Sequence, residues 1–149
     1  HRRVRETPSP RYAPSPQPEG VAGVLLDSDV VIEILRGRVG IAEGLVATEM
    51  QGIPTYCCAI TWAEIGAGLR RGEEATTEDF FQARGEVVID AATGRRAGAY
   101  LSRHARSHNV EIADALIAAA ASTAGLALWT LNRKHYPMED LRLYNPPRT

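Results

Sequence analysis

The sequence of 149 residues has few aromatic residues, a single lysine and no long apolar run. No stretch approaches the ~20 consecutive apolar residues that a membrane-spanning helix needs. Residues 1–20 also lack the apolar segment of a signal peptide. We therefore expect a cytoplasmic protein that is not associated with a membrane.

Positive charge in this chain is almost entirely arginine, because Lys134 is the only lysine. Arginine forks match phosphate oxygens in a bidentate way, although genome base composition produces the same bias. The formal net charge is −1, so the chain as a whole has no basic field that would indicate nucleic-acid binding. Any surface for phosphates must therefore be local.

Cysteine is also scarce, with only Cys57 and Cys58, which are adjacent in a predicted strand. Neighbouring side chains of a strand point to opposite faces, which disfavours an ordinary disulfide between them. We expect two buried free thiols in a reducing compartment.

Two regions differ in composition. Residues 1–20 contain five prolines and almost no bulky apolar residue, which predicts an extended or disordered leader. The chain opens on His1 rather than Met, as a truncated or tagged product does. Residues 21–149 are long enough for one domain with a hydrophobic core.

Strand and helix patterns alternate throughout the second region, and this alternation predicts a parallel sheet covered by helices. We expect strands at residues 24–26, 53–59, 86–89, 126–131 and 141–144. We expect helices at residues 30–36, 39–50, 61–72, 77–84, about 93–107 (capped by Asp90 or Thr93) and 112–124.

Three acidic residues open helices that follow a strand or a break. Asp27 comes directly after the first strand, Glu64 lies in "TWAEIGAGL", and Asp114 lies in the first turn of an alanine-rich helix. In a parallel sheet such openings converge on one edge, where ligands bind. Carboxylates that meet there repel each other, and a divalent cation such as Mg²⁺ removes the conflict. Such an ion activates water and stabilises charge on a phosphodiester oxygen.

Each acid also has a local structural explanation. Asp27 could cap the next helix, and Thr61 and Glu64 have the T-x-x-E spacing of a capping box. Asp114 could simply interact with the helix dipole. Local sequence alone leaves both interpretations open.

The segment "WTLNRKHY" adds neutral and basic groups at the end of a strand. Thr130 and Asn132 offer neutral oxygen ligands, and Asn132 could bind a metal, orient a water or cap the next turn. His135 could act as a general acid or lie exposed in the loop.

Three motifs together resemble the PIN domain, and within that group the VapC-type toxin ribonucleases. They are "LLDSDVVIEIL", "ITWAEIGAGLRRG" and "IADALIAAAASTAGLALWTLNRKHY", and the match runs from about residue 23 to 144. The acids follow in the matching order, with 37 residues from Asp27 to Glu64 and 50 from Glu64 to Asp114.

This resemblance implies a three-layer α/β/α sandwich with a central parallel sheet of four or five strands. It also implies Mg²⁺- or Mn²⁺-dependent endoribonuclease activity on tRNA or rRNA. By position, Asp27 and Asp114 would be the most direct metal ligands, and Glu64 would bind metal or help deprotonate the attacking water. Thr130 would hydrogen-bond within the cluster, and Asn132 stands where the family often has a fourth acid.

The same resemblance implies a homodimer and a VapB-type antitoxin that offers an arginine to the acidic pocket. Basic side chains near helix ends could line an RNA track, although a solvated face explains each one alone. They are Arg36, Arg38, Arg70, Arg71, Arg133 and Lys134.

Two other functions fit part of the sequence. In a haloacid-dehalogenase-type phosphatase, Asp27 would be the nucleophile, Asp29 the acid and Lys134 a phosphate partner, but the C-terminal part lacks paired aspartates for magnesium. An inactive PIN-like binding module is the second alternative, and the three intact acids argue against it.

Overall fold

The computed structural model describes residues 21–148, so the predicted leader at residues 1–20 lies outside the described residues. Its elements follow in the order β1 (Val24–Leu26), α1 (Ser28–Leu35), α2 (Val39–Met50), β2 (Thr55–Cys58), α3 (Ala59–Ala67), α4 (Glu74–Gln82), β3 (Gly85–Val87), α5 (Ala91–His108), α6 (Ile112–Ala124), β4 (Ala127–Trp129) and the 3-10 turn η1 (Arg133–His135).

The four strands form one parallel sheet in the order β3-β2-β1-β4. Val24 of β1 lies opposite Thr55 on one side and Ala127 on the other. The fifth strand predicted at residues 141–144 is reduced to a single bridge between Leu128 and Leu143. Pro146 and Pro147 follow, and proline has no N–H with which to continue a ladder.

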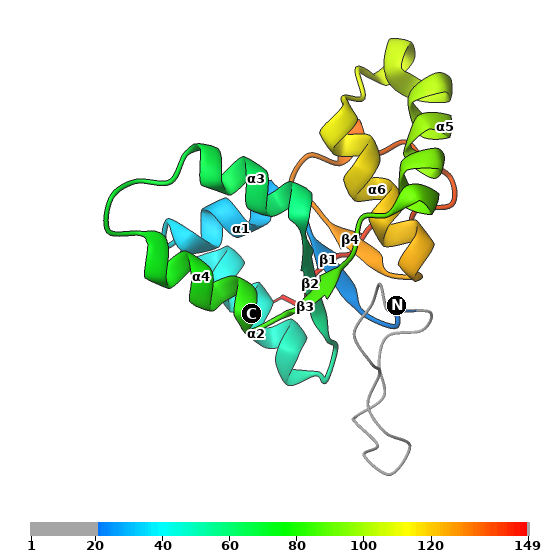
Figure 1. Ribbon diagram of the computed structural model, residues 1–149. Helices are drawn as coiled ribbons and strands as arrows, with labels where there is room; N and C mark the ends of the chain where they lie inside the picture. The colour runs from blue at the N-terminus through cyan, green and yellow to red at the C-terminus, as the bar shows by residue number, and fades with distance from the viewer. Residues whose placement is uncertain (1–20, 149) are drawn as a thin grey trace.

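Helices cover both faces of the sheet, so the predicted α/β/α sandwich is confirmed (Figure 1). Helices α1 to α4 lie on one face and α5 and α6 on the other. Each face of the sheet has its own hydrophobic core, and strand side chains alternate between them. Val24 and Leu26 pack into the core under α1–α4, and Leu25 packs into the core under α5 and α6.

The two cysteines follow the same alternation. Cys57 packs into the core on the α1–α4 side, and Cys58 into the core on the α5–α6 side. Both are buried and free, as predicted. Burial raises the pKa of the Cys57 thiol to about 12, so it stays protonated at neutral pH.

Helix α6 is the central element of the second layer. Its alanines from Ala118 to Ala121 have no exposed surface, and the helix ends at Gly125 with a φ of +72°, a conformation that favours glycine. Helix α5 packs beside it, and the two are joined by residues 109–111. This pairing brings the start of α6, with Asp114, to the edge where the strands end.

Some element boundaries differ from the predicted ones. Helices α2 and α6 have the predicted bounds, but α3 starts at Ala59 and stops at Ala67, well before residue 72. Gly68 ends α3, and Gly72 has a φ of +93°, which is incompatible with a continuing helix. Helix α4 begins at Glu74, three residues earlier than predicted.

Within residues 21–148, every helix is too short or too polar to cross a lipid bilayer.

Candidate active site

Asp27 lies where the order of the sheet reverses, between the carboxyl ends of neighbouring strands β1 and β4. Its Oδ1 accepts the Ser28 N–H at 2.8 Å, so it caps α1. Its Oδ2 accepts hydroxyl groups from Thr130 at 2.8 Å and from Tyr136 at 2.9 Å. Asp27 therefore caps α1 and also lies at the switch point of the sheet.

The surroundings of Asp27 shift the pKa of its carboxyl group in opposite directions. Burial raises the pKa of Asp27, the three hydrogen bonds lower it, and the negative charge of Glu64 raises it. Burial also raises the pKa of Tyr136 far above its ordinary value, and the charge of Asp27 adds to this. The Tyr136 phenol therefore remains a proton donor to Asp27 over the physiological range.

Asp29 is a site residue that the predicted acidic cluster omitted, although its carboxylate stands two positions after Asp27 and the phosphatase alternative used it as the acid. Its Oδ2 accepts the Leu131 N–H at 3.1 Å and the Thr130 hydroxyl at 3.4 Å. Its Oδ1 is buried and has no hydrogen-bond partner among the described residues. The Asp-x-Asp spacing at the start of a helix was the available signal, because it keeps both carboxylates at one end of α1.

Burial, and then the charge of Asp27, raise the pKa of Asp29 from its ordinary 3.8 to about 6. The folded protein therefore binds more protons here than the unfolded chain between about pH 4 and 6. The contribution of Asp29 to the free energy of unfolding is therefore largest below about pH 4, and it is lost as the pH rises through 6.

Asp29→Asn is expected to stabilise the metal-free protein at pH 7.5 by about 1 kcal/mol, a value reduced for the partial solvent exposure of the carboxyl. The gain should shrink at pH 5, where Asp29 itself is largely protonated. Urea unfolding in EDTA at pH 7.5 and at pH 5 measures the free energy of unfolding of the variant and of the unaltered protein. Asp79→Asn on the exposed face of α4 controls for the loss of one negative charge, and an equal gain from it would contradict the prediction.

Glu64 projects from α3 toward the start of α1. Its Oε1 accepts a hydrogen bond from the Ser28 hydroxyl. The capping-box interpretation of Thr61 and Glu64 is wrong, because β2 runs directly into α3 and Cys58 is its N-cap. Thr61 is instead fully buried inside the helix, and Glu64 is free to serve the site.

A pocket of about 500 Å³ opens beside Glu64. Its walls come from α1, α3 and the start of α4, and they combine apolar and charged side chains. The lining includes Ile32, Leu35, Arg36, Ile65, Leu69 and Arg70.

Asp114 caps the start of α6 and also lies close to His135. Its Oδ2 accepts the Glu111 N–H at 3.1 Å, which is half of a capping box at the start of α6. The same oxygen lies 3.5 Å from Nδ1 of His135. Its side chain retains 19% exposure, so it also faces solvent at the mouth of the site.

Asn132 and His135 link Asp114 to the buried acid Asp27. The Asn132 amide nitrogen lies 3.1 Å from Nδ1 of His135, and the Asn132 N–H donates to the Thr130 hydroxyl at 3.0 Å. That hydroxyl in turn donates to Asp27. The contacts therefore run without a break from Asp114 to Asp27.

The donor set of this site suits a hard divalent cation, since it consists of carboxylate, hydroxyl and amide oxygens. Among the described residues, no three His, Cys, Asp or Glu side chains are drawn together tightly enough to hold a metal ion as they stand. Mg²⁺ usually keeps several waters and takes only one or two carboxylates, so this arrangement is compatible with it. Oδ1 of Asp29 has no hydrogen-bond partner among the described residues, and the negative charge of Glu64 raises the pKa of Asp27, so the site gathers negative charge that a cation would neutralise.

The basic residues predicted for an RNA track are spread over several elements. Arg71 and Lys134 are exposed, and Arg133 is exposed with its guanidinium donating to Asn145 Oδ1 at 3.1 Å. Arg38 pairs with Glu33 at 3.2 Å.

Comparisons with known proteins agree with this geometry. The family model of the PIN domain matches residues 24–140. Ribonuclease VapC10 of Mycobacterium tuberculosis is 37% identical over 119 residues, which cover 77% of this chain and 86% of that protein. Ribonuclease VapC19 of the same organism is 30% identical over 115 residues, covering 76% and 92%.

Solved structures show the same fold. DNA-bound VapBC from Salmonella typhimurium matches with a TM-score of 0.67 and 22% identity, covering 83% of this chain and 98% of that one. FitAcB from Neisseria gonorrhoeae matches with a TM-score of 0.61 and 27% identity, covering 83% and 97%. The phosphatase alternative is therefore set aside, and the chain belongs to the PIN domain family.

Proposed function

We propose that this protein is a metal-dependent endoribonuclease and the toxin of a toxin–antitoxin pair. The observation that carries the proposal is Asp27, a buried carboxylate that three donors hold at the switch point of the sheet. Glu64 shares Ser28 with it as a hydrogen-bond partner, and Asp29 shares Thr130. Asp114 lies 3.5 Å from His135, which contacts Asn132. Relatives of similar length are named ribonucleases, which supports RNA as the substrate.

Mg²⁺ or Mn²⁺ would be held by one or two of the carboxylates of Asp27, Asp114 and Glu64, together with waters, and would supply water activation and charge stabilisation at the scissile phosphate. Thr130 and Tyr136 keep the Asp27 carboxylate in one orientation. Glu64 offers a carboxylate oxygen that can take a proton from the attacking water. Asp29 supplies a fourth carboxylate beside the segment that carries Asn132, where the family often has an acid.

The partners follow from the resemblance and from the charge of the site. We propose tRNA or rRNA as the substrate, with Arg71, Arg133 and Lys134 near its path. We also propose a VapB-type antitoxin, because an arginine would pair with these carboxylates as a cation does. The pocket beside Glu64, with its apolar walls, could seat such a segment. A homodimer in the cytoplasm completes the proposal.

Induced expression in a bacterium tests the proposal. The unaltered protein is expected to stop growth and create new RNA ends, whereas Asp114→Asn should do neither, because it removes one carboxylate of the site. Purified protein should lose its RNA cleavage in EDTA and regain it with Mn²⁺. Asp79→Asn is the matched control and should behave like the unaltered protein. Equal growth of all strains with no new RNA ends would refute the ribonuclease.

A further inference from the structure

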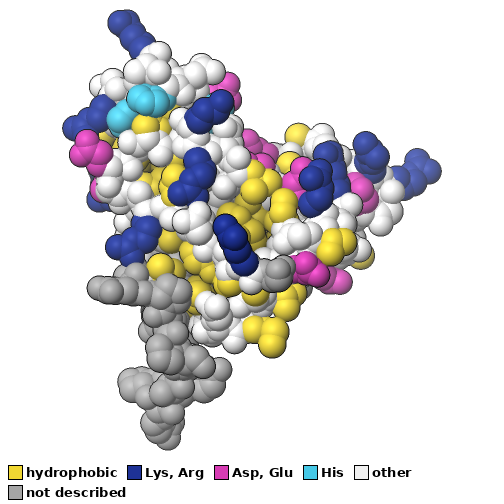
Figure 2. Space-filling model, turned by 180° about the vertical axis from the view of Figure 1, so that it is seen from behind, with side chains coloured by type: hydrophobic (Ala, Val, Ile, Leu, Met, Phe, Trp, Pro, Cys, Tyr) yellow, Lys and Arg dark blue, Asp and Glu magenta, His cyan; other side chains and the backbone are white. Residues whose placement is uncertain are grey.

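Helix α5 carries a concentration of positive charge that the proposed active site does not use. It contains four exposed arginines and no acidic residue. Outside α5, residues 21–149 hold nine Lys or Arg against sixteen Asp or Glu. Figure 2 views the molecule from behind and shows basic and histidine side chains gathered over the α5–α6 lobe. The four arginines are Arg95, Arg96, Arg103 and Arg106.

A groove of about 610 Å³ runs along one side of this helix. Its α5 wall is a stripe of residues at helical spacing, and its other wall is the segment from Met138 to Asp140. The floor is partly apolar, and the rim is charged. The α5 stripe consists of Ala92, Arg95, Arg96, Ala99, Tyr100, Arg103 and His104.

Hydrogen bonds fix the two walls of the groove to each other. The Tyr100 hydroxyl donates to Asp140 Oδ1 at 2.7 Å and lies 2.7 Å from Ser122 Oγ on α6. Arg96 pairs with Asp140 Oδ2 at 3.5 Å. Arg96 thus neutralises the charge of Asp140, and these contacts hold the two walls of the groove in place.

Two arginines remain available in this groove. Arg95 and Arg103 make no hydrogen bond or ion pair with another residue of the described part of the chain. They are eight residues apart, about 12 Å along the helix axis, so they would reach different phosphates of one strand. Glu139 is the one remaining acid on the rim.

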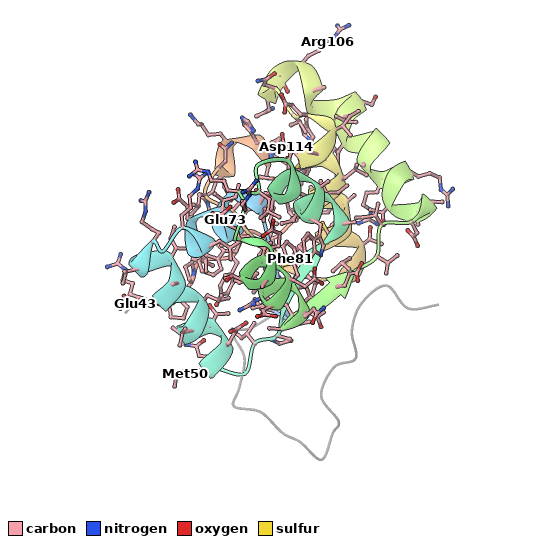
Figure 3. All side chains as sticks on the ribbon, turned by 60° about the vertical axis from the view of Figure 1, so that its left-hand side comes forward. Glu43, Met50, Glu73, Phe81, Arg106 and Asp114 are labelled. Carbon is pink, nitrogen blue, oxygen red and sulfur yellow. The ribbon has the colours of Figure 1, made fainter. Side chains whose placement is uncertain are left out.

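The groove is connected to the proposed active site at two points. The segment that begins at Tyr136, the hydrogen-bond donor to Asp27, continues directly into Met138 and Asp140. The C-terminal end of α5 also lies toward the start of α6, where Figure 3 labels Arg106 and Asp114. Arg95 lies thirteen residues before the end of α5, about 20 Å away along its axis, so an RNA must span several nucleotides to reach it from the active site.

We propose that the α5 groove binds the sugar-phosphate backbone of RNA that extends beyond the active site. Arginine forks match phosphate oxygens and bind them bidentately, and the apolar floor accepts the sugar edges. The inference rests on the proposed function, because it makes the groove a second contact for the same substrate. It predicts a dependence on RNA length that the active site alone does not produce.

The test measures the affinity of labelled oligouridylates of 24 and 6 nucleotides in EDTA at several KCl concentrations. Arg95→Gln with Arg103→Gln should weaken binding of the 24-mer about tenfold and of the 6-mer by a clearly smaller factor, because the 6-mer spans less of the groove. The salt dependence of 24-mer binding should become shallower by about 1.4 in log–log slope, because two single-strand phosphate contacts are lost. Glu139→Gln should tighten binding of the 24-mer.

Arg142→Gln with Arg148→Gln removes the same charge from exposed positions outside the groove, and should change 24-mer binding less than twofold. Thermal unfolding verifies that each variant is folded, and light scattering gives its oligomeric state. Equal losses in the two double variants, or an unchanged 24-mer affinity, would overturn the inference. A change of oligomeric state in the first variant would also overturn it, because the groove would then be an interface between copies.

Cleavage assays separate this inference from the proposed function. A protein that cuts RNA yet binds the 24-mer independently of Arg95 and Arg103 has the proposed activity without the groove contact. A protein that binds the 24-mer through these arginines and creates no RNA ends has the groove contact without the activity.

Discussion

Replacing Asp27 by Asn is expected to lower RNA cleavage at least about 1,000-fold, a loss of ~4 kcal/mol in transition-state stabilisation. The reason is the position of the carboxylate, which is buried at the switch point and, under the proposed function, holds the metal directly. Asparagine has the same shape but no charge, so its attraction for a divalent cation falls sharply. Single-turnover cleavage at saturating Mn²⁺ measures the effect.

The stability of Asp27→Asn distinguishes a chemical loss from a structural one. The amide oxygen can still accept hydrogen bonds from Thr130 and Tyr136, but the amide nitrogen then faces the Ser28 N–H, which loses its acceptor. This loss opposes the gain from removing a buried charge, so we expect a net change within about 1 kcal/mol. A variant that stays folded and cleaves at the normal rate would refute the role of Asp27.

Tyr136→Phe is expected to weaken Mn²⁺ binding 10- to 100-fold, the range typical for groups that orient a metal ligand. The variant removes one hydroxyl, the donor at 2.9 Å from Asp27 Oδ2, and leaves the buried ring in place. With one donor fewer, the pKa of Asp27 should rise further, and the acid limb of the pH–rate profile should move to higher pH. Tyr136 acts through Asp27, so it is a positioning residue. Titration calorimetry with Mn²⁺ gives the affinity without relying on turnover.

Tyr144→Phe is a closely matched control in the opposite core. Tyr144 is also buried, and its hydroxyl lies 3.0 Å from the neutral Thr48 Oγ1. Tyr144→Phe should lose about 1 kcal/mol of stability, the usual value for a neutral hydrogen bond, and Tyr136→Phe about 1.5–3 kcal/mol, because its acceptor is a carboxylate. Only Tyr136→Phe should change metal affinity and the pH profile. Equal behaviour of the two would reduce Tyr136 to a packing residue.

Local patterns in the sequence were sufficient for most of the fold. Helices α2 and α6 have the predicted bounds because glycine follows each one closely, at Gly52 and Gly125. The boundary error at α3 has a physical cause, since no loop separates Cys58 from Ala59 and the helix starts before the T-x-x-E motif. A capping signature in sequence does not reveal that a strand already leads into the helix.

The site was less accessible from sequence than the fold. Asp27, Glu64 and Asp114 stood out because each was predicted to open a helix, which holds for Asp27 and Asp114, whereas Glu64 lies inside α3. Ser28 hydrogen-bonds both Asp27 and Glu64, and Asp114 lies beside His135. Tyr136 was missed because its importance comes from a partner more than a hundred positions away, whereas Asp29 was noted beside Asp27 but was not assigned to the acidic cluster. Thr130 is 103 residues and Tyr136 is 109 residues from Asp27, and no periodicity encodes such contacts.

Those long separations have a consequence for synthesis of the protein. Two groups that orient Asp27 come from Thr130, directly after β4, and from Tyr136, directly after η1, more than a hundred residues after Asp27 itself. While that segment is still inside the exit tunnel, the first strand has emerged but its aspartate lacks both hydroxyl donors. A nascent chain therefore cannot assemble this hydrogen-bonded centre until the segment from Thr130 to Tyr136 has emerged.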